Sequence, residues 1–542
     1  MLKELFKNSP IKSITGAAAI VALSSFVSRI LGLFRDRVLA GEFGAGEMLD
    51  IYYAAFRLPD FMYSLLILGG LSAAFIPVFT GFLRKDTSNK DAFEFANTVI
   101  SVGLVVIVPL IAMGVLFAPY IINMFVAPGF TPEQQTLTTS LTRIMFLSPL
   151  LLGISGVASY ILQSFKRFFL YSLAPIFYNV GIIIGALYFT DFLGLHGLSW
   201  GVVLGAALHL LIQLPGLRGI NFKFSFIPDF KHKQLKTFAT LAVPRTFNLL
   251  VIQLNLVVIT FIASYLTPGS ITVFNLANNI QGVPIGIIGI SFAVAAFPAL
   301  SEYANFKEKK HFSNSLSKTV NEILFFVLPL TILIIALRAQ IVRVILGTGA
   351  FNWEDTIITF NTLGFFSISL FAQSLIPLLL RAFYALKNTY IPLIISIFAF
   401  VLNIALSFLF SIHYTLGVPG LALAFSIANI FQLIGLWVAL RIQFGYLNDL
   451  NVLKSGIRIL FATVSMLPFI IYMKIFVASA IGTDTFITVL LQGVVTGFVA
   501  IVVYILVSWL IRSEELSVFV NAIKRRLFKP KAPIDVGAGR EM

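Results

Sequence analysis

Residues 96–118 read ANTVISVGLVVIVPLIAMGVLFA and contain no charged side chain. A helix of about 20 apolar residues crosses the hydrocarbon core of a bilayer, which is about 30 Å thick. Comparable apolar blocks recur along the chain, at approximately 14–40, 51–83, 96–118, 137–164, 169–190, 197–217, 237–264, 271–300, 317–346, 357–386, 390–411, 418–441, 456–478 and 485–511. The sequence therefore predicts an all-α polytopic membrane protein with about fourteen transmembrane helices.

The composition agrees with a membrane protein. The chain has 542 residues, of which 58% are hydrophobic and 11% charged, and its mean hydropathy is +0.96. A soluble protein needs about a quarter of its residues charged. The chain contains no cysteine, which excludes disulfides and thiol chemistry. Its net charge of +15 would indicate nucleic acid in a soluble protein, but the basic residues gather in short loops. We therefore expect membrane lipids as partners and no nucleic acid.

The charges of the loops predict the orientation. Connections after even-numbered blocks are basic, as in RKDTSNK (84–90) and KEKK (307–310), and the tail carries KRRLFKPK (524–531). Connections after odd-numbered blocks lack Lys and Arg. Because basic loops stay in the cytoplasm, both termini are predicted to be cytoplasmic, which requires an even number of spans. The first block is interrupted by Arg29 and has no cleavage site, so it reads as a retained helix rather than a signal peptide.

An internal repeat divides the chain. Phe130 and Phe351 lie in similar turns, and Asn179 and Asn403 lie in similar blocks. The two pairs are separated by nearly the same length of chain, which spans six blocks. This constant offset predicts two six-helix, pseudo-symmetric lobes related by an axis along the membrane normal, around a central cavity. The predicted domains are the lobes 1–220 and 221–445, the appended helices 13 and 14 in 446–512, and a basic cytoplasmic tail, 513–542.

Charged residues in the first two blocks are the candidate functional group. Arg29 lies deep in its block and is followed by Arg35, Asp36, Asp50 and Arg57. A charged side chain at the bilayer centre costs about 2.5–3.5 kcal/mol, so it normally faces a cavity or a partner. Guanidinium groups bind phosphate through two parallel hydrogen bonds, which favours recognition of an anionic group. The structural alternatives are a buried structural pair for Arg29 and an interfacial ion cluster at the outer end of the helix for Arg35, Asp36 and Arg37.

Nothing in the sequence indicates an enzyme. The five histidines are scattered without the spacing of metal ligands, and no nucleophile or phosphate-loop motif lies in a suitable context. We expect neither a cofactor nor a catalytic residue.

Several stretches resemble the MurJ (MviN) family of lipid II flippases, which belongs to the MATE-like (MOP) exporter superfamily. They include SRILGLFRD (28–36), LSAAFIPVF (71–79), APGF (127–130) and RAFYALKNTYIP (381–392). The resemblance implies fourteen helices and a cavity that opens alternately to either side. It also implies translocation of undecaprenyl-diphosphate-linked peptidoglycan precursor across the bacterial cytoplasmic membrane, for cell-wall synthesis and cell shape, with the cell-wall synthesis machinery as a partner.

The resemblance also assigns roles to residues. The cavity arginines of the family carry over to Arg29 and Arg35, its acidic neighbour to Asp36 and its outer aspartate to Asp50. The predicted substrate-binding residues, with Asn279 as a neutral donor, are Arg29, Arg35, Asp36, Asp50, Arg57 and Asn279.

The sequence departs from the family in two regions. Tyr63 and Leu68 stand where many members have an arginine and a glutamate, and Asn278-Asn279 stands where an Asp-Arg pair is common. The diphosphate would then be held by fewer cations, or the substrate or its coupling would differ.

Three other functions remain open at this point. A related flippase would carry another polyprenyl-linked polysaccharide repeat. A cation-coupled drug antiporter predicts a carboxylate in the mid-membrane cavity, where the sequence offers arginines. A membrane scaffold would give no reason for Arg29. Transport would be driven by the membrane potential or by a monovalent cation.

Overall fold

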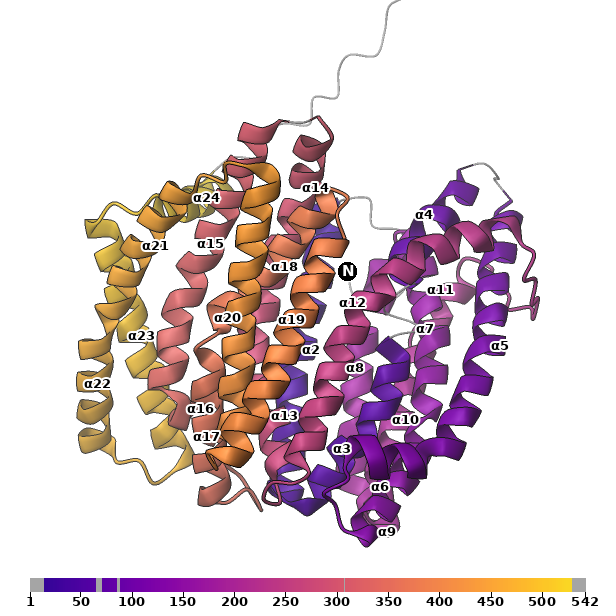
Figure 1. Ribbon diagram of the computed structural model, residues 1–542, viewed down its shortest axis with the longest axis horizontal. Coiled ribbons are helices and arrows are strands. Elements are labelled where there is room, and N and C mark those ends of the chain that lie inside the picture. Colours follow the sequence, from indigo (N-terminus) through magenta and orange to yellow (C-terminus); the bar gives the residue numbers. More distant parts are fainter. Residues whose placement is uncertain (1–13, 65–70, 85–87, 307, 529–542) are drawn as a thin grey trace, which may run out of the picture.

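The structure is a computed structural model that describes residues 14–64, 71–84, 88–306 and 308–528. All regular elements within these ranges are helices, and most run roughly side by side through the molecule (Figure 1). The predicted all-α fold is confirmed.

We call residues 14–218 the first half and residues 233–444 the second half. The helices of the first half, including short π-helical segments (η), are α2 (Ile14–Phe43), α3 (Glu47–Tyr63), α4 (Leu71–Leu83), α5 (Lys90–Ile121), η2 (Ile122–Val126), α6 (Pro132–Met145), α7 (Leu147–Ser164), α8 (Phe168–Ile184), η3 (Gly185–Phe189), α9 (Thr190–Leu193), α10 (His196–Leu211) and α11 (Leu214–Arg218).

The helices of the second half are α12 (Lys233–Ala263), α13 (Ser270–Pro284), η4 (Ile285–Ile290), α14 (Ser291–Asn305), α15 (Lys309–Ala336), α16 (Arg338–Ile345), α17 (Trp353–Ser367), α18 (Leu370–Ala385), α19 (Tyr390–Ser407), η5 (Phe408–His413) and α20 (Gly417–Phe444). They are followed by α21 (Asp449–Val464), α22 (Met466–Ile481), α23 (Phe486–Leu510) and α24 (Glu514–Phe528).

Ten helical segments among the described residues are long and apolar enough to cross a bilayer, or eleven if the bent pair α17 and α18 forms one span. The other predicted spans coincide with α2, with α3 and α4, and with α12. The chain is therefore a multi-span membrane protein, and the count of fourteen stays a prediction.

The two halves lie on opposite sides of the molecule, with α2 and α12 between them (Figure 1). Helix α2 packs against α8 of its own half and also contacts α13 and α16 of the other half. Helix α12 packs against α4 and α19. These two central helices therefore place their side chains where the halves meet.

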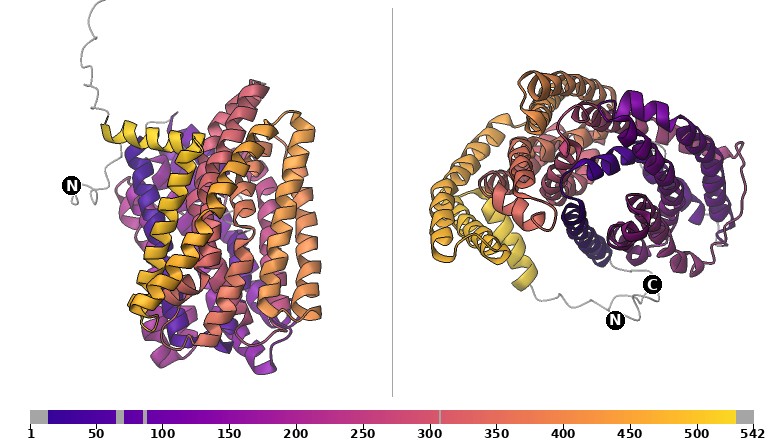
Figure 2. Two further views of the ribbon diagram at one scale, coloured as in Figure 1. Left: turned by 90° about the vertical axis from the view of Figure 1, so that its left-hand side faces the viewer. Right: turned by 90° about the horizontal axis from the view of Figure 1, so that it is seen from below.

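The C-terminal helices form an outer layer on the second half. Helices α21 and α23 contact α15, and α23 also contacts α16 (Figure 2). Large apolar side chains such as Phe498 and Ile475 are exposed on this layer, as expected for surfaces that face lipid. The predicted tail begins with a helix, α24, which lies across the end of the bundle (Figure 2). Residues 529–542 of that tail lie outside the described residues.

Glycines bring α8 and α10 into close contact. A Cβ atom on Gly181 would lie 2.3 Å from the backbone of Gly205, and one on Gly185 would lie 2.4 Å from Gly201. Both distances are shorter than a side chain allows, so only glycine permits this packing, which is common between membrane helices. Helix α8 is thus held between α10 and α2, and it carries Asn179, the polar side chain that it contributes to the site.

The two halves share one local irregularity. Helices α8 and α19 both continue into a π-helical turn, which begins at Gly185 in the first half and at Phe408 in the second. These two starts are separated by nearly the same length of chain as Asn179 and Asn403, so the irregularity follows the sequence repeat. The division into two homologous lobes stays a prediction, which this recurrence supports.

Candidate substrate site at the junction of the halves

Helix α2 carries an ion pair in the interior of the bundle. Arg35 donates from Nε and Nη2 to Oδ1 of Asp36, at 3.1 and 2.7 Å. The Asp36 side chain is only 2% exposed, whereas that of Arg35 is 21% exposed. Burial of an unpaired charge would be costly, so the pairing of neighbouring residues permits both to lie inside the membrane region.

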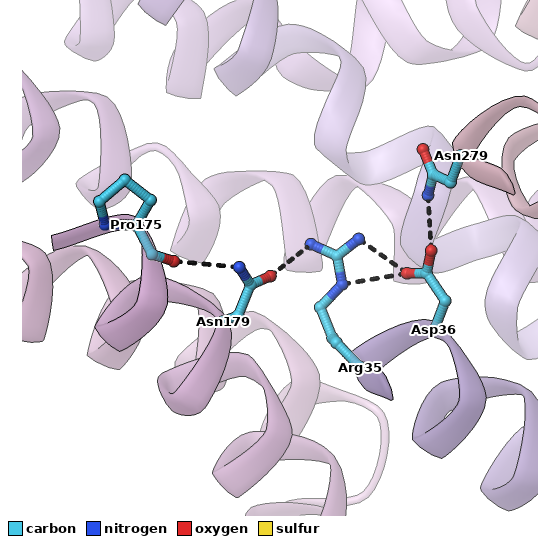
Figure 3. Close-up of polar contacts among 5 residues, drawn as sticks. All are labelled: Arg35, Asp36, Pro175, Asn179 and Asn279. Carbon is cyan, nitrogen blue, oxygen red and sulfur yellow. Dashed lines mark hydrogen bonds and ion pairs between the residues drawn. The ribbon is translucent and has the colours of Figure 1, made fainter. Parts of the chain in front are cut away.

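Two asparagines complete the hydrogen bonds of this pair (Figure 3). On α8, Asn179 accepts from Nη1 of Arg35 at 3.1 Å and donates to the carbonyl of Pro175 at 3.0 Å. On α13, Asn279 donates to Oδ2 of Asp36 at 2.9 Å. The network therefore joins the first half to the second through α2.

Arg29 lies nearer the start of α2 and has no such partner. Its Nη1 donates to the carbonyl of Gly282 at 3.4 Å, a long contact, and the ion pairs among the described residues do not include it. Its guanidinium lies against Gly286, where an added Cβ would be 2.1 Å from the Arg29 Cζ atom. Arg29 therefore spans the junction of the halves with most of its donors unused.

Arg57 is buried between the halves. Its Nε donates to Oγ1 of Thr260 on α12, and its Nη2 donates to Oδ1 of Asn275 on α13, both at 2.7 Å. These neutral acceptors satisfy the guanidinium in place, so the structure gives Arg57 a role in joining α3 to the second half. Its predicted contact with substrate stays a prediction.

Asp60 is a carboxylate that the sequence patterns above did not single out. It lies one turn after Arg57 on α3, is half-buried, and is close enough to Arg57 and Arg35 to interact with both electrostatically. Pro59, directly before Asp60, makes a continuous helix harder to predict there. The spacing of three residues between Arg57 and Asp60 would nevertheless have predicted that the two side chains are neighbours on one helix face. Asp60 therefore adds a second carboxylate near Asp36, whereas the cavity lined by Arg29 contains none.

Asp50 lies away from the Arg35 network and caps a helix of the other half. Its carboxylate accepts from the backbone N–H of Gly269 and of Thr272 and from the Thr272 hydroxyl, each at 2.7 Å. These donors are at the N-terminus of α13, where a negative charge is favourable. Asp50 therefore fastens α3 to α13.

Other bonds between the halves gather at the same end of the bundle. The Ala350 N–H donates to the Gly41 carbonyl at 2.7 Å, and the Gly129 N–H donates to the Ser264 hydroxyl at 3.1 Å. At this end a Cβ on Gly269 would lie 2.0 Å from the Ala45 carbonyl oxygen. The halves are thus tightly joined where α2 ends.

Arg37, the next residue on α2, makes contacts with the second half and with α23. It donates to the carbonyls of Val344 and Ile345, at 2.7 and 3.3 Å, and lies over the ring of Phe486. Carbonyls at a helix C-terminus attract cations.

The positions that depart from the family fall in different places. Tyr63 lines a cavity together with Arg29. Asn279 bonds to Asp36, and Asn278 accepts from Gln281 at 3.0 Å. Leu68 lies outside the described residues.

The second half has an asparagine that corresponds to Asn179, but its partner is another asparagine and not an arginine. Asn403 on α19 donates to Asn255 on α12 at 2.7 Å. Within the sequence repeat, Asn403 corresponds to Asn179 and Asn255 to a position close to Arg35. At these positions the first half holds an arginine and the second half an asparagine.

No group of histidine and acidic side chains that could hold a metal ion occurs in the part of the chain that the structure describes.

The comparisons with known proteins identify the family of the chain. A family model described as "Lipid II flippase MurJ" matches residues 39–492. The chain belongs to the lipid II flippase MurJ family. A MurJ-family relative from Rhizobium tropici, named "Probable lipid II flippase MurJ", is 28% identical over 512 residues, covering 92% of this chain and 94% of the relative.

Solved structures show the same relationship. A MurJ-family structure, "Lipid II flippase MurJ, inward closed conformation", has 27% identity and a TM-score of 0.73, covering 94% of this chain and 100% of the other. A MATE-family multidrug transporter of the MOP superfamily in an inward-facing conformation has 16% identity and a TM-score of 0.65, covering 80% of this chain and 99% of the other. The second likeness shows a shared fold alone.

Proposed function

We propose that this protein moves lipid II from the inner to the outer leaflet of the bacterial cytoplasmic membrane by alternating access. The observation that carries the proposal is Arg29, a guanidinium at the junction of the halves that pairs with no carboxylate among the described residues, in a chain of the MurJ family. A cation kept in the membrane region needs an anionic partner, and a diphosphate supplies one.

Arg29 would bind the diphosphate first, and Arg35 would follow. In the described state Asp36 occupies two donors of Arg35, so the carboxylate competes with phosphate when the site is empty. Asn279 would be released from Asp36 in the same step and become a neutral donor. Asp50 and Arg57 would act by holding the halves together, because their partners are backbone and neutral side chains.

The described state favours loading from the cytoplasm. The bonds of Asp50, Gly41 and Gly129 to the second half lie at the end of the bundle where α2 finishes. With both termini cytoplasmic, this is the outer end, and closing it keeps the head group from leaving. The polyprenyl tail would stay in lipid beside α21–α23, whose apolar side chains face outward.

The driving force would be the membrane potential or a monovalent cation. The arginines Arg29, Arg35 and Arg57 and the aspartates Asp36 and Asp60 leave the empty site with one net positive charge. A potential of 100 mV acting on one charge is worth about 2.3 kcal/mol, enough to return the empty carrier inward. In liposomes, a flipping rate indifferent to an imposed potential would refute this coupling.

The test is rescue of bacterial cells depleted of their own lipid II flippase. We expect the unaltered protein to restore growth, Arg29→Ala to fail, and Arg29→Lys to rescue partly, because lysine keeps the charge but loses bidentate binding. Arg143→Ala is the matched control, since Arg143 is exposed and its Nε donates only to a backbone carbonyl. A membrane scaffold predicts that Arg29→Ala rescues fully. Failure of the well-expressed unaltered protein would favour a flippase for another polyprenyl-linked glycan.

A further inference from the structure

A cavity of about 460 Å³ lies within the first half, beside Arg29. It is lined by the residues Val21, Ser25, Ser28, Arg29, Tyr63, Gly156, Ser159, Tyr160, Tyr171, Ser172, Pro175 and His209, from α2, α3, α7, α8 and α10. This volume is in the range of small-molecule sites, roughly 300–1,000 Å³. From Val21 to Arg29 the cavity follows α2 for about 12 Å, at 1.5 Å per residue.

The lining is rich in hydroxyl groups and contains no carboxylate. Four serines and three tyrosines contribute hydroxyls, and Arg29 is the only formally charged side chain among the lining residues. Within the described part of the chain, Ser25 and Ser28 on α2 form no hydrogen bond through their side chains. Tyrosine rings add flat apolar faces beside polar tips. Hydroxyls and aromatic faces suit a neutral, polyhydroxylated ligand.

The far wall is held in place by its own hydrogen bonds. Ser155 donates to the His209 carbonyl at 3.0 Å and contacts His209 Nδ1 at 2.7 Å, while Gln213 donates to the Ser155 hydroxyl at 2.6 Å. Ser159 donates to Gln213 at 2.9 Å. With the Ser155 proton on the carbonyl, Nδ1 carries the ring proton and Nε2 is left as an acceptor. The wall therefore presents a fixed imidazole rather than an adaptable one.

We propose that this cavity is the subsite for the sugar that adjoins the diphosphate, with Arg29 at its phosphate end. The inference rests on the proposed function. A stem peptide, which carries several carboxylates and an amine, fits less well, because the lining offers a single cation and no carboxylate. In this arrangement Tyr63 supplies a ring and a hydroxyl to the sugar.

The test compares three ligands on the purified full-length protein in nanodiscs. They are undecaprenyl diphosphate, undecaprenyl diphosphate carrying the disaccharide without peptide, and complete lipid II. The variants Tyr63→Phe and Tyr171→Phe, alone and together, remove hydroxyls and keep the rings. Tyr188→Phe is the control, because Tyr188 is exposed and lies outside the cavity lining.

We expect the double variant to bind both glycosylated ligands about tenfold more weakly, as two lost hydrogen bonds imply, and to bind undecaprenyl diphosphate unchanged. Equal weakening for undecaprenyl diphosphate, weakening for complete lipid II alone, or no weakening would each overturn the inference. So would failure of the unaltered protein to bind the disaccharide ligand more tightly than undecaprenyl diphosphate. Failure of the proposed function looks different: the unaltered protein would show the sugar-dependent binding yet move no lipid II across liposomes.

Discussion

Asn279 on α13 donates to one carboxylate oxygen of Asp36 at 2.9 Å, while Arg35 donates to the other at 2.7 Å. One buried carboxylate thus holds a cation of its own helix and an amide of the opposite half (Figure 3). The N–H groups that Arg35 and Asn279 donate to Asp36 are not free for phosphate while these bonds last. The bond between Asn279 and Asp36 therefore links occupancy of the site to the contact between the halves.

Replacement of this carboxylate should strengthen anion binding and slow transport. In Asp36→Asn, Arg35 loses its charged partner, and a hydrogen bond to a charged group is worth about 1.5–3 kcal/mol. We expect undecaprenyl diphosphate to bind about tenfold more tightly and lipid II flipping to fall, because the ligand is released less readily. Calorimetric titration and a liposome flipping assay measure the two effects. Weaker binding of the diphosphate would contradict competition by Asp36.

A pair of glycines tests the position of Arg29. A Cβ on Gly286 would lie 2.1 Å from the Arg29 guanidinium, whereas one on Gly282 would have no neighbour within 4 Å. Gly286→Ala should therefore displace Arg29 and reduce rescue of flippase-depleted cells nearly as much as Arg29→Ala. Gly282→Ala, one helical turn away, is the control and should rescue fully. Equal rescue by both variants would show that the position of Arg29 does not matter.

The helices could be predicted from the sequence because spans are set by local apolar length. The same holds for the pair of Arg35 and Asp36, which are adjacent in the chain and share an element. Asn179 could not be predicted as a partner, because it is 144 residues from Arg35. Asn279, 243 residues from Asp36, entered the predicted site only through the family resemblance, as a donor to phosphate and not to Asp36. A buried asparagine inside an apolar block was a visible signal, but it does not say which helix it faces.

The grouping of charges was harder to predict than their presence. Asp50 and Arg57 share the first two blocks with Arg29, and this proximity in the chain predicts a single group. In the structure Asp50 caps α13 and Arg57 bonds to α12 and α13. These contacts depend on how the halves dock, for which the sequence of one half carries no local pattern. The α-helix at 514–528 could not be predicted either, because its many charges are typical of a tail.

Substitutions at Asn179 and Asn403 can distinguish an effect on stability from an effect on substrate binding. Asn179 and Asn403 are both buried amides at equivalent positions, but Asn179 bonds to Arg35 and Asn403 bonds to Asn255. Replacement of either by leucine leaves a buried partner unsatisfied, which costs about 1–3 kcal/mol of stability. We expect similar losses of thermal stability in detergent, and weaker diphosphate binding only for Asn179→Leu. An equal effect of Asn403→Leu on binding would refute a specific role of Asn179 in the site.

The cap formed by Asp50 should control how often the outer end opens. Asp50→Asn keeps the size of the side chain but loses the charge at the α13 N-terminus, which is worth about 0.3–1 kcal/mol and up to about 2 kcal/mol at a buried site. Opening should then become up to about thirtyfold more frequent.

Because the chain has no cysteine, Ser270→Cys supplies a unique reporter beside the cap, where Ser270 is 2% exposed. Membrane-impermeant maleimide should label this cysteine faster from outside in the Asp50→Asn background. Asp191→Asn, which removes an exposed aspartate on α9, should leave the labelling rate unchanged. Slower labelling in Asp50→Asn would mean that the carboxylate opens the outer end instead of closing it.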